Sequence, residues 1–362
     1  MAVLRALQSR SAQSWMLLGL RGVGKTVLLS EVLNFAEEQG AATAFVESPE
    51  TGKLPRLLFP ALRKVLRQLS VSENAKSLAY SATRALRSFA SVFKIELGET
   101  TLSVDPEPGV ADTGDLETDL PDLLGAVGRA AQAAGTALIL FVDEVQYLSA
   151  KELAALIRSL HYTNQRGLPV LFFGAGLPQV AAQSGDAKSY AERLFVFHTI
   201  DALPEESAKR AIAGPIDREG ESITTEALDR VIEHTNGYPY FLQEWGFQTW
   251  NLAETSPIGA DVVRRAIERA IARLDGSFFK VRFDRLTLKE KEYVFAMSRL
   301  PGEGPYRSSD VANELGEDSN KLGTRRTHII RKGMIYSPAY GDIAFTVPGF
   351  KAYLHRLRQT EG

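Results

Sequence analysis

The sequence of 362 residues contains no cysteine. This excludes disulfides, thiolate metal sites and cysteine nucleophiles, and it fits a cytoplasmic protein. The chain also has no apolar run of about 18 residues, the length that a membrane-spanning helix requires. Its first residues lack the long apolar segment and the small-residue cleavage site of a secretion signal. We therefore expect a cytoplasmic protein without a membrane partner.

A strong net charge is missing too. The formal net charge is −2, and 44% hydrophobic with 24% charged residues is an ordinary globular composition. This excludes a globally basic nucleic-acid binder, so a nucleic-acid contact requires a local patch. Residues 95–128 contain nine acidic and no basic residues, whereas residues 278–362 contain fifteen basic and ten acidic ones. Three interpretations of the acidic segment stay open: a solvated surface, a site for a basic partner, or a surface that repels nucleic acid.

Hydrophobic patterns in the first half alternate between strands and helices, which favours a parallel sheet covered by helices on both faces. The predicted strands are Ser14–Leu18, Ala42–Glu47, Ala137–Val142, Val170–Phe173 and Leu194–His198. The predicted helices are Thr26–Gln39, Leu57–Leu69, Ser77–Phe93, Asp115–Ala134 and Glu152–Thr163, with a hairpin over Lys94–Val104. Residues 204–274 show no strand pattern and are predicted to form a helical bundle, with Trp245 and Trp250 in its core.

The segment GLRGVGKT, residues 19–26, fits the phosphate-loop pattern G-x-x-x-x-G-K-[ST] between a strand and a helix. Its glycines let the backbone curl until N–H groups point at phosphate oxygens, and the helix start adds its positive end. Lys25 then places a charge on the β- and γ-phosphates, and the Thr26 hydroxyl is a ligand for Mg²⁺. The predicted nucleotide contacts are Gly19, Gly22, Val23, Gly24, Lys25, Thr26 and Val27.

Two carboxylates end the buried strand ALILFVDE, residues 137–144. An acid at the end of a strand beside a phosphate loop holds Mg²⁺, usually through water, and Asp143 fits that role. Glu144 would then stand beside the γ-phosphate and polarise an attacking water as a general base. The alternative is a strand that simply meets solvent at two charged residues.

Polar groups that could sense the γ-phosphate are scarce. The strand that begins at Val170 ends in Gly174-Ala175-Gly176, so no side chain at its tip can do that work. Thr163, Asn164 and Gln165 are alternative candidates for this role. Arg193 precedes the last strand and is a candidate for a phosphate contact in the same or a neighbouring subunit. A surface arginine at the end of a helix is the alternative for Arg193.

GLRGVGKT, LILFVDE, FGAGLP, KSYAERLF and TNGYPYFLQEWG together resemble a group of bacterial and archaeal P-loop ATPases. This group lies between the origin-recognition-like AAA+ ATPases and the STAND signalling NTPases, and the resemblance covers nearly the whole chain. It implies an α/β P-loop NTPase core with a parallel sheet between helices, an α-helical lid and a winged-helix domain, with ATP and Mg²⁺ as ligands. It also implies Walker A roles for Lys25 and Thr26 and Walker B roles for Asp143 and Glu144.

The lid residues Gly237-Tyr238-Pro239 match an element that packs near the adenine in STAND proteins. Pro239 fixes a local bend, and Tyr238 or Tyr240 can stack on a base, so Tyr238 and Pro239 are predicted to bind the nucleotide. The same residues also suit a helix end followed by a helix start. No lid arginine appears between residues 237 and 250, and only eighteen residues precede Gly19, without the Gly-Arg element of relatives. These departures favour tight nucleotide holding with slow turnover.

The C-terminal residues predict a winged helix-turn-helix. Helices are expected over 288–300, 310–315 (capped by Ser309) and 320–332, followed by a ribbon of 334–336 and 343–347. The third helix would enter the major groove of double-stranded DNA. The candidate DNA contacts, all predicted to project outward, are Arg325, Arg326, His328 and Arg331. Docking onto a protein, or onto the rest of the chain, is an equal alternative.

We predict three domains: a P-loop ATPase core at 1–202 with an insertion at 52–114, a helical lid at 203–277 and a winged helix at 278–362. The predicted function is an ATP-binding protein and slow ATPase that acts as a nucleotide-dependent switch, coupling ATP binding and hydrolysis to the C-terminal winged helix. A protein partner or self-association is a further expectation. One alternative is a DNA-binding AAA+ initiator or loader. The other is a scaffold that binds nucleotide without turnover.

Overall fold

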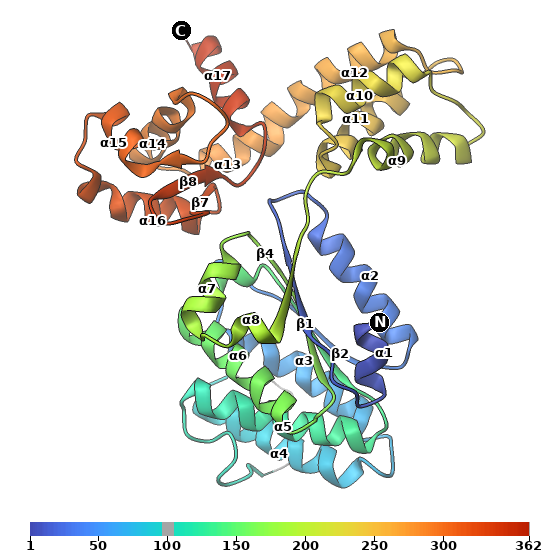
Figure 1. Cartoon of the computed structure of the whole chain (residues 1–362), viewed down its shortest axis with the longest axis vertical. Coiled ribbons are helices and arrows are strands. Elements are labelled where there is room, and N and C mark those ends of the chain that lie inside the picture. The colour runs from blue at the N-terminus through green and yellow to red at the C-terminus, as the bar shows by residue number, and fades with distance from the viewer. Residues whose placement is uncertain (96–104, 362) are drawn as a thin grey trace. The chain divides into compact units, whose positions relative to one another are not determined.

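The computed structural model describes residues 1–95 and 105–361 (Figure 1). The hairpin predicted over Lys94–Val104 lies almost entirely outside these residues. The chain divides into two compact units. The first contains residues 1–18 and 25–199, and the second contains residues 19–24 and 200–362. The predicted lid and the predicted winged helix share the second unit, so the three-part division of the chain stays a prediction.

The first unit is built on a five-stranded sheet with the order β2-β3-β4-β1-β5. Each neighbouring pair is parallel, as the alternation of strands and helices predicts. Because these strands are parallel, the carboxyl ends of β1 and β3 lie at the same edge of the sheet. The predicted acidic residues Asp143 and Glu144 therefore lie at that edge. The strands are β1 (Ser14–Leu18), β2 (Ala42–Glu47), β3 (Leu138–Asp143), β4 (Val170–Gly176) and β5 (Phe195–Thr199).

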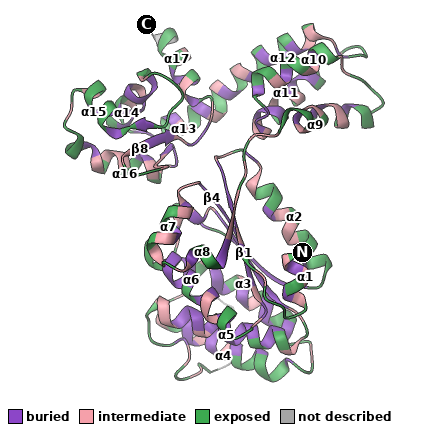
Figure 2. Ribbon diagram, in the orientation of Figure 1, coloured by how far each residue is buried: buried purple, intermediate pink, exposed green. Residues whose placement is uncertain are grey.

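Helices cover both faces of this sheet, with α1 and α2 on one side and α6, α7 and α8 on the other (Figure 1). Every residue of β3 is buried, in keeping with its hydrophobic sequence up to Asp143. The labelled strands β1 and β4 of the same sheet are drawn largely in the colour of buried residues (Figure 2). The parallel α/β architecture is thus confirmed. The helices are α1 (Ala2–Leu7), α2 (Lys25–Glu38), α3 (Leu54–Leu69), α4 (Lys76–Val92), α5 (Leu116–Ala133), α6 (Ala150–Gln165), α7 (Val180–Ala187) and α8 (Ala191–Leu194).

Part of the acidic segment has a structural role. The Asp119 carboxylate is fully buried and accepts hydrogen bonds from the backbone N–H of Thr113 at 3.1 Å and of Gly114 at 2.8 Å. It thereby ties the loop before α5 to that helix. Glu117 forms an ion pair with Lys188 at 2.6 Å. These two carboxylates are satisfied within the first unit, so they are not a solvated surface.

The second unit begins with a helical bundle, as predicted. Asn236 ends α10 in the left-handed conformation at φ 47°, and Pro239 is the first residue of α11. Trp245 is buried, as predicted, but Trp250 is 41% exposed, so the prediction for Trp250 is wrong. Trp250 lies on the side of α11 that faces α9 rather than on the side packed in the core. The elements are α9 (Glu205–Arg218), α10 (Thr225–Thr235), α11 (Pro239–Leu252), α12 (Ala260–Arg273), a π-helical turn η2 (Leu274–Phe279) and α13 (Lys280–Asp284).

The C-terminal part of the second unit combines helices with a small antiparallel sheet of order β6-β8-β7. Only a two-stranded ribbon was predicted, because β6 has two residues and is too short to show a pattern. Ser309 does not cap the second helix: α15 begins at Ser308, whose N–H and hydroxyl both donate to the Gly341 carbonyl at 2.8 Å. Helix α17 was not predicted. The elements are α14 (Leu288–Arg299), β6 (Tyr306–Arg307), α15 (Ser308–Leu315), η3 (Ser319–Leu322), α16 (Gly323–Arg331), β7 (Ile335–Tyr336), β8 (Asp342–Phe345) and α17 (Phe350–Glu361).

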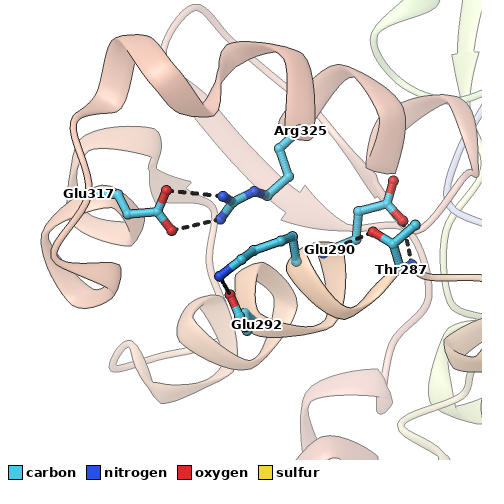
Figure 3. Close-up of polar contacts among 6 residues, drawn as sticks. Thr287, Glu290, Glu292, Glu317 and Arg325 are labelled. Atoms are coloured by element: carbon cyan, nitrogen blue, oxygen red, sulfur yellow. Dashed lines mark hydrogen bonds and ion pairs between the residues drawn. The ribbon is translucent and has the colours of Figure 1, made fainter.

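An ion pair between a buried carboxylate and a partly exposed lysine fixes the start of α14. Thr287 caps the helix, and Glu290 completes a capping box with it (Figure 3). The Glu290 carboxylate also accepts a 2.6 Å bond from Lys332 Nζ, which donates to the Arg285 carbonyl at 2.8 Å as well. Burial by itself raises the pKa of Glu290, but the hydrogen bonds from Lys332 and Thr287 bring that pKa below its ordinary value.

We expect Lys332→Met to lower the free energy of unfolding by about 1–3 kcal/mol at neutral pH, because it leaves a buried carboxylate without its cation. The folded pKa of Glu290 lies below its unfolded value of about 4.3, so the ion pair stabilises the fold above that pH. Its contribution is lost as the pH falls through the folded pKa. Urea unfolding at pH 7 and near pH 4 measures both effects.

The matched control for this prediction is Lys289→Met. Lys289 and Glu292 form an exposed pair at 2.8 Å on the same helix (Figure 3). Removing an exposed pair of this kind changes stability by no more than about 1 kcal/mol. Equal losses in the two lysine variants at pH 7 would contradict the role assigned to Lys332.

Candidate nucleotide-binding site

The phosphate-loop sequence is divided between the two units, since Gly19–Gly24 belongs to the second and Lys25 begins α2 in the first. Two glycines of the loop have the left-handed backbone that favours glycine, Gly22 at φ 88° and Gly24 at φ 90°. A Cβ at Gly19 would lie 2.1 Å from the Ile200 carbonyl oxygen. The loop therefore favours glycine at Gly19 and Gly24, which the motif specifies, and also at Gly22, which stands at one of its variable positions.

In the first unit, Thr26 and Asp143 meet although 117 residues separate them. The Thr26 hydroxyl, on the first turn of α2, donates to Asp143 Oδ2 at 2.6 Å. Asp143 is the last residue of β3 and is 3% exposed. A hydroxyl and a carboxylate are the oxygen ligands that Mg²⁺ takes beside water and phosphate oxygens. The two side chains therefore fit a Mg²⁺ site of the kind predicted for them.

Glu144 follows Asp143 in an unusual backbone conformation. Its φ of 54° and ψ of 42° are left-handed, which non-glycine residues adopt at a cost of about 1–3 kcal/mol. Its N–H donates to Asp143 Oδ1 at 2.8 Å, and its carbonyl accepts from Tyr147 N at 3.0 Å. The Gln146 amide nitrogen donates to Glu144 Oε2. Gln146 was not predicted from the sequence, although its position two residues after the acidic pair was a usable signal.

The other residues predicted to bind the nucleotide or its phosphates differ in how far they are buried. Lys25 is half-buried at the start of α2. Val27 is 62% exposed in the first unit, whereas Val23 is buried in the hydrophobic core of the second unit. Arg193 lies on α8 with an exposed side chain. The roles predicted for these residues stay predictions.

In the second unit, Tyr238 holds the phosphate-loop segment. Its hydroxyl donates to the Arg21 carbonyl, and its ring packs against Phe241 with 5.1 Å between ring centroids. Burial, aided by the nearby Asp201 carboxylate, raises the pKa of Tyr238 well above the usual tyrosine range, so the hydroxyl stays protonated. Tyr238 is 5% exposed, which leaves Tyr240 as the better candidate for stacking on a base.

Backbone groups from two further places in the second unit also bind this segment. Tyr240 N, in the first turn of α11 after Pro239, donates to the Gly22 carbonyl at 3.1 Å. Arg21 N donates at 3.2 Å to the carbonyl of Thr346, which follows β8. The predicted lid and the C-terminal part thus both form backbone hydrogen bonds with residues 21–22 of the phosphate loop.

The predicted DNA contacts are not equally available. Arg325 does not project outward: its guanidinium makes two bonds to the Glu317 carboxylate, at 2.9 and 3.0 Å (Figure 3). These bonds from Arg325 are the main reason that the pKa of Glu317 is lowered. Glu317 follows the Gly316 turn, which brings it beside α16. Arg326 is half-buried, whereas His328 and Arg331 are exposed.

The family model of the AAA ATPase domain matches residues 1–173. A second family, described as a domain of unknown function (DUF8462), matches residues 276–354. No curated protein matches the chain. Among the described residues, 1–95 and 105–361, no helix has the length and hydrophobicity of a membrane span.

Solved structures of AAA+ proteins are similar to the chain over nearly its whole length. RuvB of Thermotoga maritima, a Holliday junction branch migration motor, has a TM-score of 0.46 at 14% identity, covering 98% of this chain and 91% of its own. Orc1 of Aeropyrum pernix, in complex with DNA, has a TM-score of 0.48 at 13% identity, covering 99% and 91%. Cdc6p of Pyrobaculum aerophilum has a TM-score of 0.45 at 14% identity, covering 99% and 93%.

We expect Gly22→Ala to weaken ATP binding at least about tenfold. Besides the strained φ, the new Cβ would lie 2.9 Å from Tyr240 Cβ and 3.2 Å from Tyr238 Cε1. Isothermal titration with ATP and Mg²⁺ measures the affinity. Gly40→Ala is the control, because Gly40 has a φ of 81° with open space around it. A Gly22→Ala protein that binds ATP as tightly as the control would contradict the expectation.

Proposed function

We propose that this protein is a Mg²⁺-dependent ATP-binding switch with slow ATPase activity. The observation that carries the proposal is the Thr26–Asp143 hydrogen bond within the matched AAA ATPase domain. It joins the residue after the phosphate-loop lysine to the acid at the end of β3, which is the pair that P-loop enzymes use for the metal. ATP is the proposed substrate and ADP the proposed product.

The proposed chemistry uses four residues of the chain. Lys25 neutralises the β- and γ-phosphates, while Thr26 and Asp143 hold Mg²⁺. Bound there, Mg²⁺ neutralises charge that develops on the phosphates during transfer. Glu144 accepts a proton from the attacking water. Arg193, exposed on α8, is proposed to reach a phosphate of a neighbouring subunit if the chain self-associates.

The switch proposal draws on contacts in the second unit. Tyr240 binds the Gly22 carbonyl through its N–H and stacks on Phe278 at 4.5 Å between ring centroids. The adjacent Phe279 stacks on Tyr353 of α17 at 5.2 Å. Phe278 and Phe279 belong to the π-helical turn η2, a local irregularity that is frequent at functional sites. A change in the loop on nucleotide binding would therefore reach α17 through packed residues.

Steady-state ATP hydrolysis by the purified protein tests this function. We expect slow turnover that Lys25→Ala and Glu144→Gln each reduce by at least about 100-fold, the usual contribution of a general base. Glu144→Gln should still bind ATP, because only the proton acceptor is lost. Wild-type turnover equal to that of both variants would overturn the ATPase and leave a nucleotide-binding scaffold. Turnover that duplex DNA leaves unchanged would direct the search to a protein partner.

A DNA-binding AAA+ protein is the second candidate. It rests on the basic α16, which with α14, α15 and the β6-β8-β7 sheet has the element order of a winged helix. We propose this winged-helix assignment for residues 278–362, with the STAND-like layout of core, lid and winged helix. Arg331 and His328 are its exposed groups, whereas Arg325 is engaged by Glu317.

If DNA is the partner, Arg331→Ala should weaken duplex binding at all sequences and lower the slope of log K against log salt by about one unit. Arg325→Ala should change that slope less, since the Arg325 guanidinium is paired with Glu317. Fluorescence anisotropy with labelled duplexes at several salt concentrations measures both variants. Binding that responds to neither arginine would rule out α16 as the DNA-reading element.

A further inference from the structure

The end of β4 has no side chain that could sense the reacting groups. The strand closes with Gly174, Ala175 and Gly176, and all three are buried. A polar group next to the general base must therefore come from another element. Gln146 is that group, on the 3₁₀ turn η1 (Val145–Tyr147) that follows Glu144.

The Gln146 side chain joins the end of β4 to Glu144. Its Oε1 accepts a hydrogen bond from Leu177 N at 3.1 Å, and its Nε2 donates to Glu144 Oε2. Leu177 immediately follows β4 and is 3% exposed, so its N–H has no ready access to water. Because the N–H of Leu177 requires an acceptor, the amide of Gln146 is oriented with its NH₂ group toward the carboxylate.

Gly176 makes room for this arrangement. A Cβ at position 176 would lie 3.0 Å from Gln146 Oε1 and 2.9 Å from Val180 Cγ2. The glycine that removes a sensor side chain from β4 thus admits the amide from η1. On the other side, the left-handed backbone of Glu144 is set by the start of the same turn. Both anchors of Gln146 belong to the first unit.

We propose that Gln146 is a positioning residue for ATP hydrolysis, which orients the Glu144 carboxylate and couples it to the end of β4. The proposal rests on the proposed ATPase function. The amide donates one hydrogen to a fixed oxygen of Glu144, which leaves the other oxygen to accept the proton of the attacking water. Gln146 itself does not exchange a proton with the substrate.

The test compares two substitutions in the full chain. Gln146→Leu has a similar volume but can bind neither partner, so we expect kcat to fall about tenfold while the KM for ATP stays within about twofold. Gln146→Glu keeps an acceptor for Leu177 N but places a second carboxyl beside Glu144. Because two carboxyls in one site resist ionisation, the acidic limb of the pH–kcat profile should move to higher pH. The readout that a merely structural residue would not give is the loss of kcat at an unchanged KM in Gln146→Leu.

Gln183→Leu on α7 is the matched control, because Gln183 is exposed in the same unit, and it should keep the wild-type kcat. Amide hydrogen exchange at Leu177, followed by NMR, reports the bridge without turnover: Gln146→Leu should speed it, and Gln146→Glu should not. Wild-type kcat and pH profile in both Gln146 variants would overturn the proposal. A wild type without Lys25-dependent turnover would instead overturn the ATPase, and unchanged Leu177 exchange in Gln146→Leu would show that the bridge itself is wrong.

Discussion

The hydrogen bond between Thr26 and Asp143 is the constraint on which the rest of the site depends. It joins the first turn of α2 to the end of β3, and these elements lie in the chain on either side of α3, α4 and α5. Asp143 is placed for this bond because it is the last residue of β3, where that strand reaches the edge of the sheet. The next residue, Glu144, has a left-handed backbone, which is incompatible with an extended strand, so β3 ends at Asp143. The order of the sheet thus decides where the acids emerge, and a local irregularity decides how the second acid points.

Residues of the second unit bind the backbone of the phosphate-loop residues Arg21 and Gly22. Tyr238 and Tyr240 bind the carbonyls of Arg21 and Gly22, and Thr346 accepts the N–H of Arg21. Because these carbonyls accept hydrogen bonds, the peptides that contain them have a fixed orientation. The Arg21 and Gly22 carbonyls are therefore held by contacts within the protein. A change in this loop on ligand binding would therefore alter its contacts with Tyr238, Tyr240 and Thr346. This favours a switch over a motor that must release the loop rapidly in each cycle.

The sequence predicted the parallel sheet and most helices well, because their patterns are long and the buried strands are nearly continuous in hydrophobicity. It predicted Thr26 and Asp143 as partners because the two motifs are defined by chemistry at fixed positions. It failed where single contacts decide the outcome. Arg325 was expected to project outward, but Glu317 follows the Gly316 turn and pairs with it, and a helical pattern carries no information about such a pairing. Strand β6 was also missed, because two residues are too few to show a pattern. Trp250 has a large apolar side chain, typical of a core residue, but it lies on an exposed face.

Gln146 shows why an apparent gap in a motif can mislead. The glycines that end β4 indicate a missing sensor when only the strand is considered. In three dimensions a Cβ at Gly176 would crowd the Gln146 amide, so the small residue and the polar one belong to a single arrangement. The position of this polar group thus depends on two elements: η1 supplies the Gln146 side chain, and β4 leaves space for it at Gly176. Under the proposed ATPase function, the uncharged amide would orient the Glu144 carboxylate without adding charge near the phosphates.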